Sequence, residues 1–187
     1  MELMFFLLNR RVDGFRVGSG SLQDFSRNLR TFVEKRKSYC VYFVSLRTLR
    51  RAGEYENGPA ALSNADLLIP GSDWLARSLR RHLALKAQKI SRKHLTDVLL
   101  EALPWNMVCF YGEDNRQLRS LTRQYPEITA ITRNEKSPSA DSVLNRAGFS
   151  LVFVCLPEGE QLRWMNEMKG KVKACMVGLG DGSSTWF

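Results

Sequence analysis

Residues 149–165, FSLVFVCLPEGEQLRWM, constrain the fold more than any other stretch of the chain. Their first half is an unbroken apolar run rich in β-branched and aromatic residues, which predicts a strand buried on both faces. Pro-Glu-Gly at 157–159 ends that run, and Leu162, Met165 and Met168 then recur at helical spacing. A strand that passes directly into a helix is the unit of an open α/β sheet. Ligands bind at this junction because helix N-termini and loop amides gather there, although an ordinary β–α connection has the same pattern.

The same alternation of apolar runs and helical patterns continues through the chain. We expect further strands at 3–8, 38–46, 65–70, 107–111, 128–132 and 173–179, and a turn or short hairpin at 13–20. We expect helices at 21–37, 72–82, 94–102, 114–124, 141–146 and 159–169, with shorter helical turns at 48–51 and 60–64. Ser21 can cap the first of these helices. Strands that alternate with helices predict a single α/β domain over 1–187, a three-layer α/β/α fold with a mainly parallel, Rossmann-like sheet.

The charge of the chain favours an anionic partner. The 187 residues carry a formal net charge of +9, which suits a nucleic acid, a phosphorylated small molecule or a membrane surface. The basic residues form scattered pairs rather than one tail, so most of them are expected on solvated helix faces. No RNP, KH or helix-turn-helix signature accompanies the charge, and we therefore expect no nucleic acid partner.

The cysteines and the N-terminus bear on location. Cys40, Cys109, Cys155 and Cys175 have no CxxC spacing and lie in or beside apolar runs, which disfavours a metal site and suits free thiols in a reducing cytosol. The N-terminal MELMFFLL is shorter than the roughly 20 residues that span a bilayer, and it lacks the features of a signal peptide. We expect a cytoplasmic protein, with a peripheral contact at the inner face of the membrane as a further option.

Three loops at predicted strand ends, 68–73, 111–116 and 156–161, should converge at one edge of the sheet. Asp73 is the best-placed carboxylate for a general base, unless it caps the following helix. Gly112 precedes a helix and offers free backbone amides to a phosphate. The chain has no GxGxxG, Walker or GxSxG motif, so neither a P-loop enzyme nor an α/β-hydrolase is expected.

Two residues just past the opening strand are ligand candidates. Gln161 could hydrogen-bond a sugar or a nucleobase, and its alternative is a solvated residue at a helix start. Trp164 could stack on a ring, and its alternative is a place in the core.

The order of several segments resembles the bacterial WecG/TagA/CpsF glycosyltransferase family. Over about residues 12–182 the chain presents, in order, ADLLIP, MVCFYG, YPEI, FSLVFVCLPEGEQLRWM and KACMVGLG. Family members have an ADLVLPDG-like segment, a strand ending in Gly before a helix that ends in YP, a DVLFVGLGxPxQExW segment and a VGVGG-like strand. The family's Gln-x-x-Trp pair is present as Gln161 and Trp164.

The resemblance implies transfer of N-acetylmannosamine or a related hexose from a UDP-sugar to an undecaprenyl-diphosphate-linked sugar. The resemblance also implies a cytoplasmic enzyme at the membrane face, with a polyprenyl-diphosphate-linked sugar as its acceptor. The products feed teichoic acid, enterobacterial common antigen, capsule or exopolysaccharide. The resemblance implies no metal clamp of the DxD type and no cofactor, and it implies a tendency to form homo-oligomers.

The chain also departs from the family pattern. The family's Asp after the proline is Gly71 here, which leaves Asp73 as a displaced stand-in for the catalytic base. The family's Thr-x-Asn segment appears as Phe-Val-Ser at 43–45, and the residue after Gln161 is Leu162 rather than Glu. Two functions therefore remain: a UDP-sugar-dependent glycosyltransferase, or a non-catalytic homologue that binds a nucleotide-sugar or a partner biosynthetic enzyme. The expected substrate-binding residues are Ser45, Gly112, Gly159, Gln161, Arg163 and Trp164.

Overall fold

The computed structural model describes residues 10–12, 14–83, 87–133 and 139–180. The strand expected at 3–8 lies outside these residues. A hairpin is present, but it begins earlier than the expected 13–20: it is an antiparallel pair of short strands, β1 (Arg10–Val12) and β2 (Phe15–Val17). The chain leaving this hairpin joins the main sheet, since the Gly18 amide donates to the carbonyl of Leu68 at 2.9 Å.

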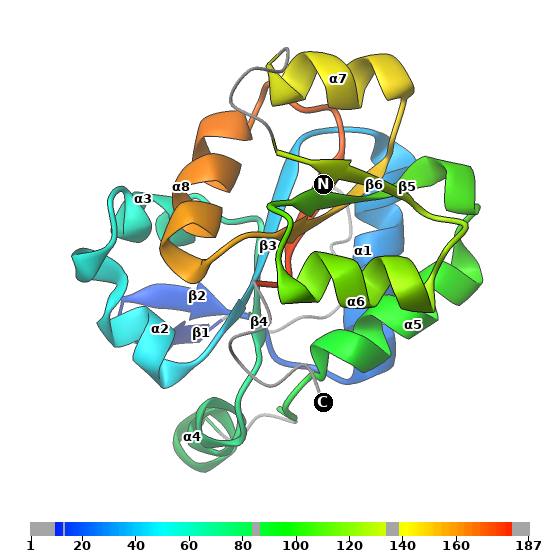
Figure 1. Ribbon diagram of the computed structural model, residues 1–187. Helices are drawn as coiled ribbons and strands as arrows, with labels where there is room; N and C mark the ends of the chain where they lie inside the picture. The colour runs from blue at the N-terminus through cyan, green and yellow to red at the C-terminus, as the bar shows by residue number, and fades with distance from the viewer. Residues whose placement is uncertain (1–9, 13, 84–86, 134–138, 181–187) are drawn as a thin grey trace.

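The main sheet has six strands, all parallel, in the order β4-β3-β8-β7-β5-β6 (Figure 1). The strands are β3 (Tyr39–Val44), β4 (Leu67–Pro70), β5 (Val108–Gly112), β6 (Thr129–Thr132), β7 (Leu151–Cys155) and β8 (Cys175–Gly178). The register pairs Val154 of β7 with Gly178 of β8, and Tyr42 of β3 with Gly178 from the other side. Five of the strands are buried along almost their whole length, as their continuous apolar runs predict.

Helices cover both faces of this sheet, which confirms the three-layer α/β/α fold. One face packs against α1 (Leu22–Lys35), α5 (Arg92–Ala102) and α6 (Arg116–Gln124). The other face packs against α2 (Leu46–Arg50), α3 (Gly58–Ser63), α4 (Asp73–Leu83), α7 (Ala140–Ala147) and α8 (Glu158–Met168), with the short 3-10 helix η1 (Ala52–Glu54) between α2 and α3. A second 3-10 helix, η2 (Trp105–Met107), precedes β5. Among the described helices, none is long and apolar enough to cross a membrane.

Helix starts depart from the expected ranges where a serine caps the helix. α2 begins at Leu46 rather than at 48, because the Ser45 hydroxyl accepts a hydrogen bond from the Thr48 amide at 3.0 Å. α5 begins at Arg92 rather than at 94, because Ser91 caps it through the His94 amide at 3.4 Å. The cap at Ser21, which the sequence did indicate, is present before α1.

The path of the chain places three strand ends together at the middle of the sheet. From β3 the chain moves outward to β4, crosses to β5 and β6, and returns through β7 to β8, which lies between β3 and β7. From β3 the chain builds the sheet toward one edge, and from β7 to β8 it builds back toward the middle. The connection after β3 thus leads away from β8 and the connection after β7 leads toward it; we call this the reversal point of the sheet. In open α/β sheets, a crevice forms at the carboxyl ends of the strands at such a point.

Candidate functional site at the carboxyl edge of the sheet

A connected set of polar side chains joins the segments that follow β3 and β7; we call it the central cluster. The Thr48 hydroxyl donates to Glu158 Oε1 at 2.7 Å, and the Tyr55 hydroxyl donates to Glu158 Oε2 at 2.9 Å. The Ser45 hydroxyl lies 2.9 Å from that of Thr48. Burial and the hydrogen bond to Glu158 raise the pKa of Tyr55. Glu158 is in the first turn of α8, where the helix dipole stabilises its negative charge.

Gln161 links α8 to the end of β8. Its side chain is buried, and its Oε1 accepts a hydrogen bond from the Gly180 amide at 2.8 Å. Gly180 has a φ of +83°, a conformation that suits glycine. At Gly178 a Cβ atom would lie 2.3 Å from Gln161 Nε2, so the glycine makes room for the amide. Gln161 is thus positioned at the reversal point of the sheet by Gly178, the last residue of β8, and by Gly180 just after it.

Trp164 lies on the inner side of α8 and is 7% exposed. Its ring stacks on Tyr111, with ring centroids 4.4 Å apart and planes 20° apart. Burial is the main reason that the pKa of Tyr111 is raised. The structure therefore gives Trp164 a protein ring as its partner, and contact with a ligand ring stays a prediction.

Two of the predicted glycines allow close approaches between segments. A Cβ atom at Gly112 would lie 2.5 Å from the carbonyl oxygen of Cys155, so β5 and β7 could not approach as they do with a side chain there. A Cβ atom at Gly159 would lie 2.8 Å from Cδ1 of Tyr55. Asn115 further joins the β5 loop to β7, since its Nδ2 donates to the Cys155 carbonyl at 2.7 Å.

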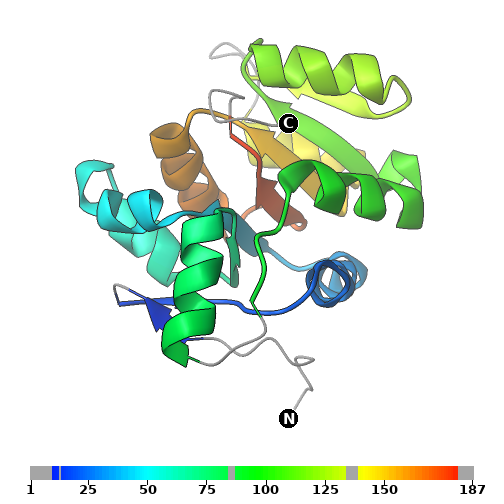
Figure 2. The same cartoon turned by 90° about the horizontal axis from the view of Figure 1, so that it is seen from below.

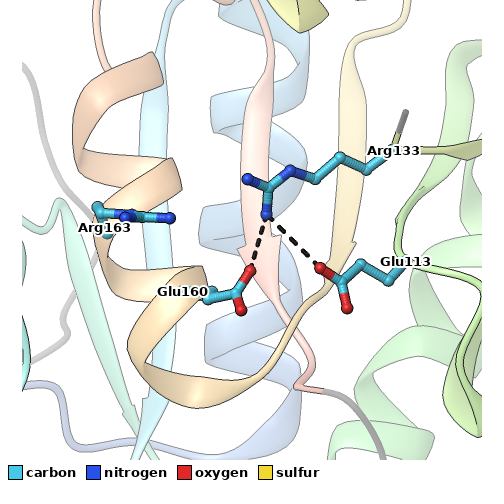
Figure 3. A pocket seen from close by; sticks show the side chains of 4 residues that line it. All are labelled: Glu113, Arg133, Glu160 and Arg163. Carbon is cyan, nitrogen blue, oxygen red and sulfur yellow. Dashed lines mark hydrogen bonds and ion pairs between the residues drawn. The ribbon is translucent and has the colours of Figure 1, made fainter. Parts of the chain in front are cut away.

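Beside α8 lies a pocket of about 390 Å³ lined by charged side chains; we call it the arginine pocket. Arg133 reaches between two carboxylates, with Nη1 2.7 Å from Glu160 and 3.7 Å from Glu113 (Figure 3). Arg163 also lines the pocket and pairs with Glu56 at 3.3 Å. Guanidinium groups bind phosphate through paired hydrogen bonds, and carboxylates accept hydrogen bonds from sugar hydroxyls. The pocket thus offers guanidinium groups to a phosphate and carboxylates to hydroxyl groups.

Asp73 lies apart from the arginine pocket. It follows β4 at one edge of the sheet, whereas Arg133 follows β6 at the other, five strand spacings or about 24 Å away. Its side chain is 71% exposed and pairs with Lys89 at 3.4 Å. The Ser72 hydroxyl accepts from the Leu75 amide at 3.3 Å at the start of α4. On the other hand, β4 is next to β3, so Asp73 flanks the Ser45 side of the carboxyl edge.

Sequence reasoning missed most of the charged residues at this edge. Glu113 and Arg133 each come one residue after the end of a strand, and the rule that parallel strand ends converge would have found both. Thr48 and Tyr55 carry no such signal, because their contact with Glu158 depends on how α2 and η1 run after β3. Among the described residues, no group of three or more His, Cys, Asp or Glu side chains could hold a metal ion.

A family model matches most of the chain. Residues 10–186 match the sequence model of the Glycosyl transferase WecG/TagA/CpsF family, and this range contains both the central cluster and the arginine pocket. No curated protein matches the chain.

Proposed function

The chain belongs to the WecG/TagA/CpsF family of glycosyltransferases, which act in cell-surface polysaccharide biosynthesis, and on that premise we propose a specific transfer reaction. The protein transfers a hexose or N-acetylhexosamine from a UDP-sugar to a lipid-diphosphate-linked acceptor. One observation carries the proposal: the segments after β3, β7 and β8 meet at the reversal point of the sheet, beside a pocket with two arginines.

In this proposal the donor lies along the first turns of α8. Arg133 and Arg163 bind the diphosphate and offset the charge of the UDP leaving group. Arg133 then exchanges its contact with Glu160 for the phosphate oxygens. Ser45 and Gln161 hydrogen-bond the sugar or the base, with the amides near Gly112 and Gly159 and the ring of Trp164 as further contacts.

The acceptor enters from the β4 side of the edge. Asp73, released from Lys89, accepts the proton of the acceptor hydroxyl as a general base. Because Asp73 and Arg133 follow opposite edges of the sheet, this step requires the start of α4 to move toward the first turn of α8 when both substrates are bound. Because a lipid-diphosphate acceptor is embedded in a membrane, the proposal includes a cytoplasmic protein that contacts the inner face peripherally. We also propose that the protein forms homo-oligomers, which light scattering measures.

A second function stands beside the first. Gly71 occupies the position where the family has its aspartate, and both arginines of the pocket are paired with carboxylates of the protein itself. These features favour a homologue that binds a nucleotide-sugar or a partner enzyme without turnover.

UDP release distinguishes the two functions. The protein is incubated with UDP-N-acetylmannosamine, UDP-glucose or UDP-N-acetylglucosamine, with and without a lipid-diphosphate acceptor analogue, and UDP is measured. The first proposal predicts release that depends on the acceptor. Binding of UDP with no release for any donor supports the non-catalytic homologue. A chain that neither binds nor releases UDP contradicts the enzyme and the nucleotide-sugar binder alike.

A further inference from the structure

Helix α4 has an exposed stripe that combines one tryptophan with arginines. Trp74 is 70% exposed, and Arg77 and Arg81 are exposed on the same side of the helix. At 100° per residue these three positions lie opposite Leu75 and Leu79, which are buried in the core. The helix is thus fixed to the body by one face and presents the other outward.

Helix α4 lies at the carboxyl edge of the sheet, with its axis parallel to one face of the molecule. α4 directly follows β4, at the carboxyl edge of the sheet where the candidate site lies. Figure 1 shows α4 at the lower end of the molecule and along its axis, whereas Figure 2, seen from below, shows the same helix lengthwise. The axis of α4 therefore lies parallel to that lower face, as in helices that lie flat on a bilayer.

The chemistry of the stripe fits the boundary between water and lipid. Tryptophan prefers the headgroup region of bilayers, and arginine attracts anionic lipids. The Arg77 guanidinium lies 6.0 Å from the centre of the Trp74 ring, so the two groups form one surface. Asp73, the acidic residue of the helix, is paired with Lys89, which offsets its charge. Among the described residues the other exposed large apolar side chain is Trp105, on η2 before the amino end of β5.

We propose that the outward stripe of α4, formed by Trp74, Arg77 and Arg81, docks the protein on an anionic lipid bilayer. This docking directs the carboxyl edge of the sheet toward the membrane. Its biological purpose rests on the proposed function, because an acceptor linked to a lipid diphosphate must reach that edge from the bilayer. The docking itself needs no donor or acceptor and is tested without either.

The first test measures binding to vesicles. The full chain is sedimented with vesicles of phosphatidylcholine, alone or mixed with phosphatidylglycerol. We expect binding only to the mixture, and the double variant Arg77→Glu, Arg81→Glu should lower the affinity by about 25-fold or more. The matched control is Arg119→Glu, Arg123→Glu, with the same spacing and charge change on an exposed face of α6. Equal losses in both variants, or no loss in either, would overturn the proposal.

The second test follows the tryptophan. Brominated lipids quench a tryptophan that lies among them, so quenching should be lost in Trp74→Phe and retained in Trp105→Phe. Retention in both variants would show that the stripe does not enter the interface. Loss of oligonucleotide binding in Arg77→Glu, Arg81→Glu, with no vesicle binding by the parent protein, would assign the stripe to nucleic acid and reject the lipid surface.

The third test separates the docking from the reaction. The variant Arg77→Glu, Arg81→Glu should release UDP at the parent rate with a water-soluble acceptor analogue and more slowly with an acceptor held in anionic vesicles. Equal rates in vesicles would reject docking and leave the proposed reaction intact. Vesicle binding that depends on α4, in a chain that releases no UDP, would support docking and reject the proposed reaction.

Discussion

Gln161 depends on the glycine at 178 more than on any side chain around it. The space for its amide exists because residue 178 has no Cβ atom, which would lie 2.3 Å from Gln161 Nε2. Through its Oε1 the same amide holds the Gly180 backbone and so shapes the segment after β8. The position of Gln161, a candidate for substrate binding, is therefore set by Gly178, which has no side chain that could contact a substrate.

Replacement of Gly178 by alanine should push Gln161 out of place. We expect a loss of about 1–3 kcal/mol in the free energy of unfolding, the usual cost of overpacking a buried site, and weaker UDP binding. Urea unfolding and calorimetry measure the two effects. The matched control is Gly53→Ala, where a Cβ atom would meet nothing within 4 Å, and its stability should stay the same or rise slightly. Equal stability of the two variants would contradict this account.

Asp73, the proposed general base, can also be tested against a control variant. If the chain releases UDP, Asp73→Asn should lower the rate by about 10²–10⁴-fold, because amides accept no proton from the acceptor. Glu101→Gln removes an exposed carboxylate near the end of α5, outside the proposed site, and it should leave the rate unchanged. An Asp73→Asn rate equal to that of the parent would remove Asp73 from the mechanism and direct attention to Glu158.

At the scale of single elements, α1 shows how a local pattern fixes a boundary. The Asp24 carboxylate accepts from the Ser21 amide at 2.9 Å, and the Asp24 amide donates to the Ser21 hydroxyl at 3.2 Å. These two bonds form a capping box at the first turn of the helix. The pKa of Asp24 is lowered, first by the hydrogen bond from the Ser21 backbone and then by that from its hydroxyl.

The capping box predicts a dependence of stability on pH. Because the folded pKa of Asp24 lies below the unfolded one, its carboxylate adds stability above the unfolded pKa, and this contribution is lost as pH falls through the folded pKa. Asp24→Asn should therefore lower the free energy of unfolding at neutral pH and make little difference near pH 2. Urea unfolding at the two pH values checks this, and an equal difference at both would contradict it. Ser21→Ala should cost about 1 kcal/mol at neutral pH.

Element types could be predicted from the sequence, and their ends only where a cap was recognised. Apolar runs and helical spacing identified the strands of the main sheet and the longer helices, because both signals are local. Ser21 was recognised as a cap, whereas Ser45 and Ser91 were not, so α2 and α5 begin two residues earlier than expected. Ser45 was predicted as a ligand contact, and the structure adds that it caps α2 beside the central cluster.

At the scale of the whole molecule, the order of the strands in the sheet decides which residues can act together. Local sequence patterns do not contain this order. The alternation of strands and helices predicts a parallel sheet but not that β4 and β6 form its opposite edges. Three predicted loops were expected to converge, yet Asp73 lies on the far side from Arg133. The position of Glu113 and Arg133 after strand ends marks them as candidates, but only the folded sheet shows that they meet Glu160 and Arg163 in the arginine pocket.

The buried cysteines report on the integrity of this fold. All four are free and buried, and burial raises the pKa of Cys40 to about 12. Since the thiolate is the reactive form, native thiols should react with a disulfide reagent near pH 8 roughly a thousand-fold more slowly than a free cysteine. In urea all four should react. A cysteine that reacts at the free rate in the native protein would contradict the burial of these strands.

The central claim is that a nucleotide-sugar binds along the first turns of α8, at the carboxyl edge of the sheet. Hydrogen exchange followed by mass spectrometry, with and without saturating UDP, tests that location directly. We predict slower exchange at 111–116, 156–163 and 178–180, with α6 beyond its first residue and the exposed end of α4 unchanged. Slower exchange confined to other segments, or UDP binding that leaves these three segments unchanged, would contradict the claim.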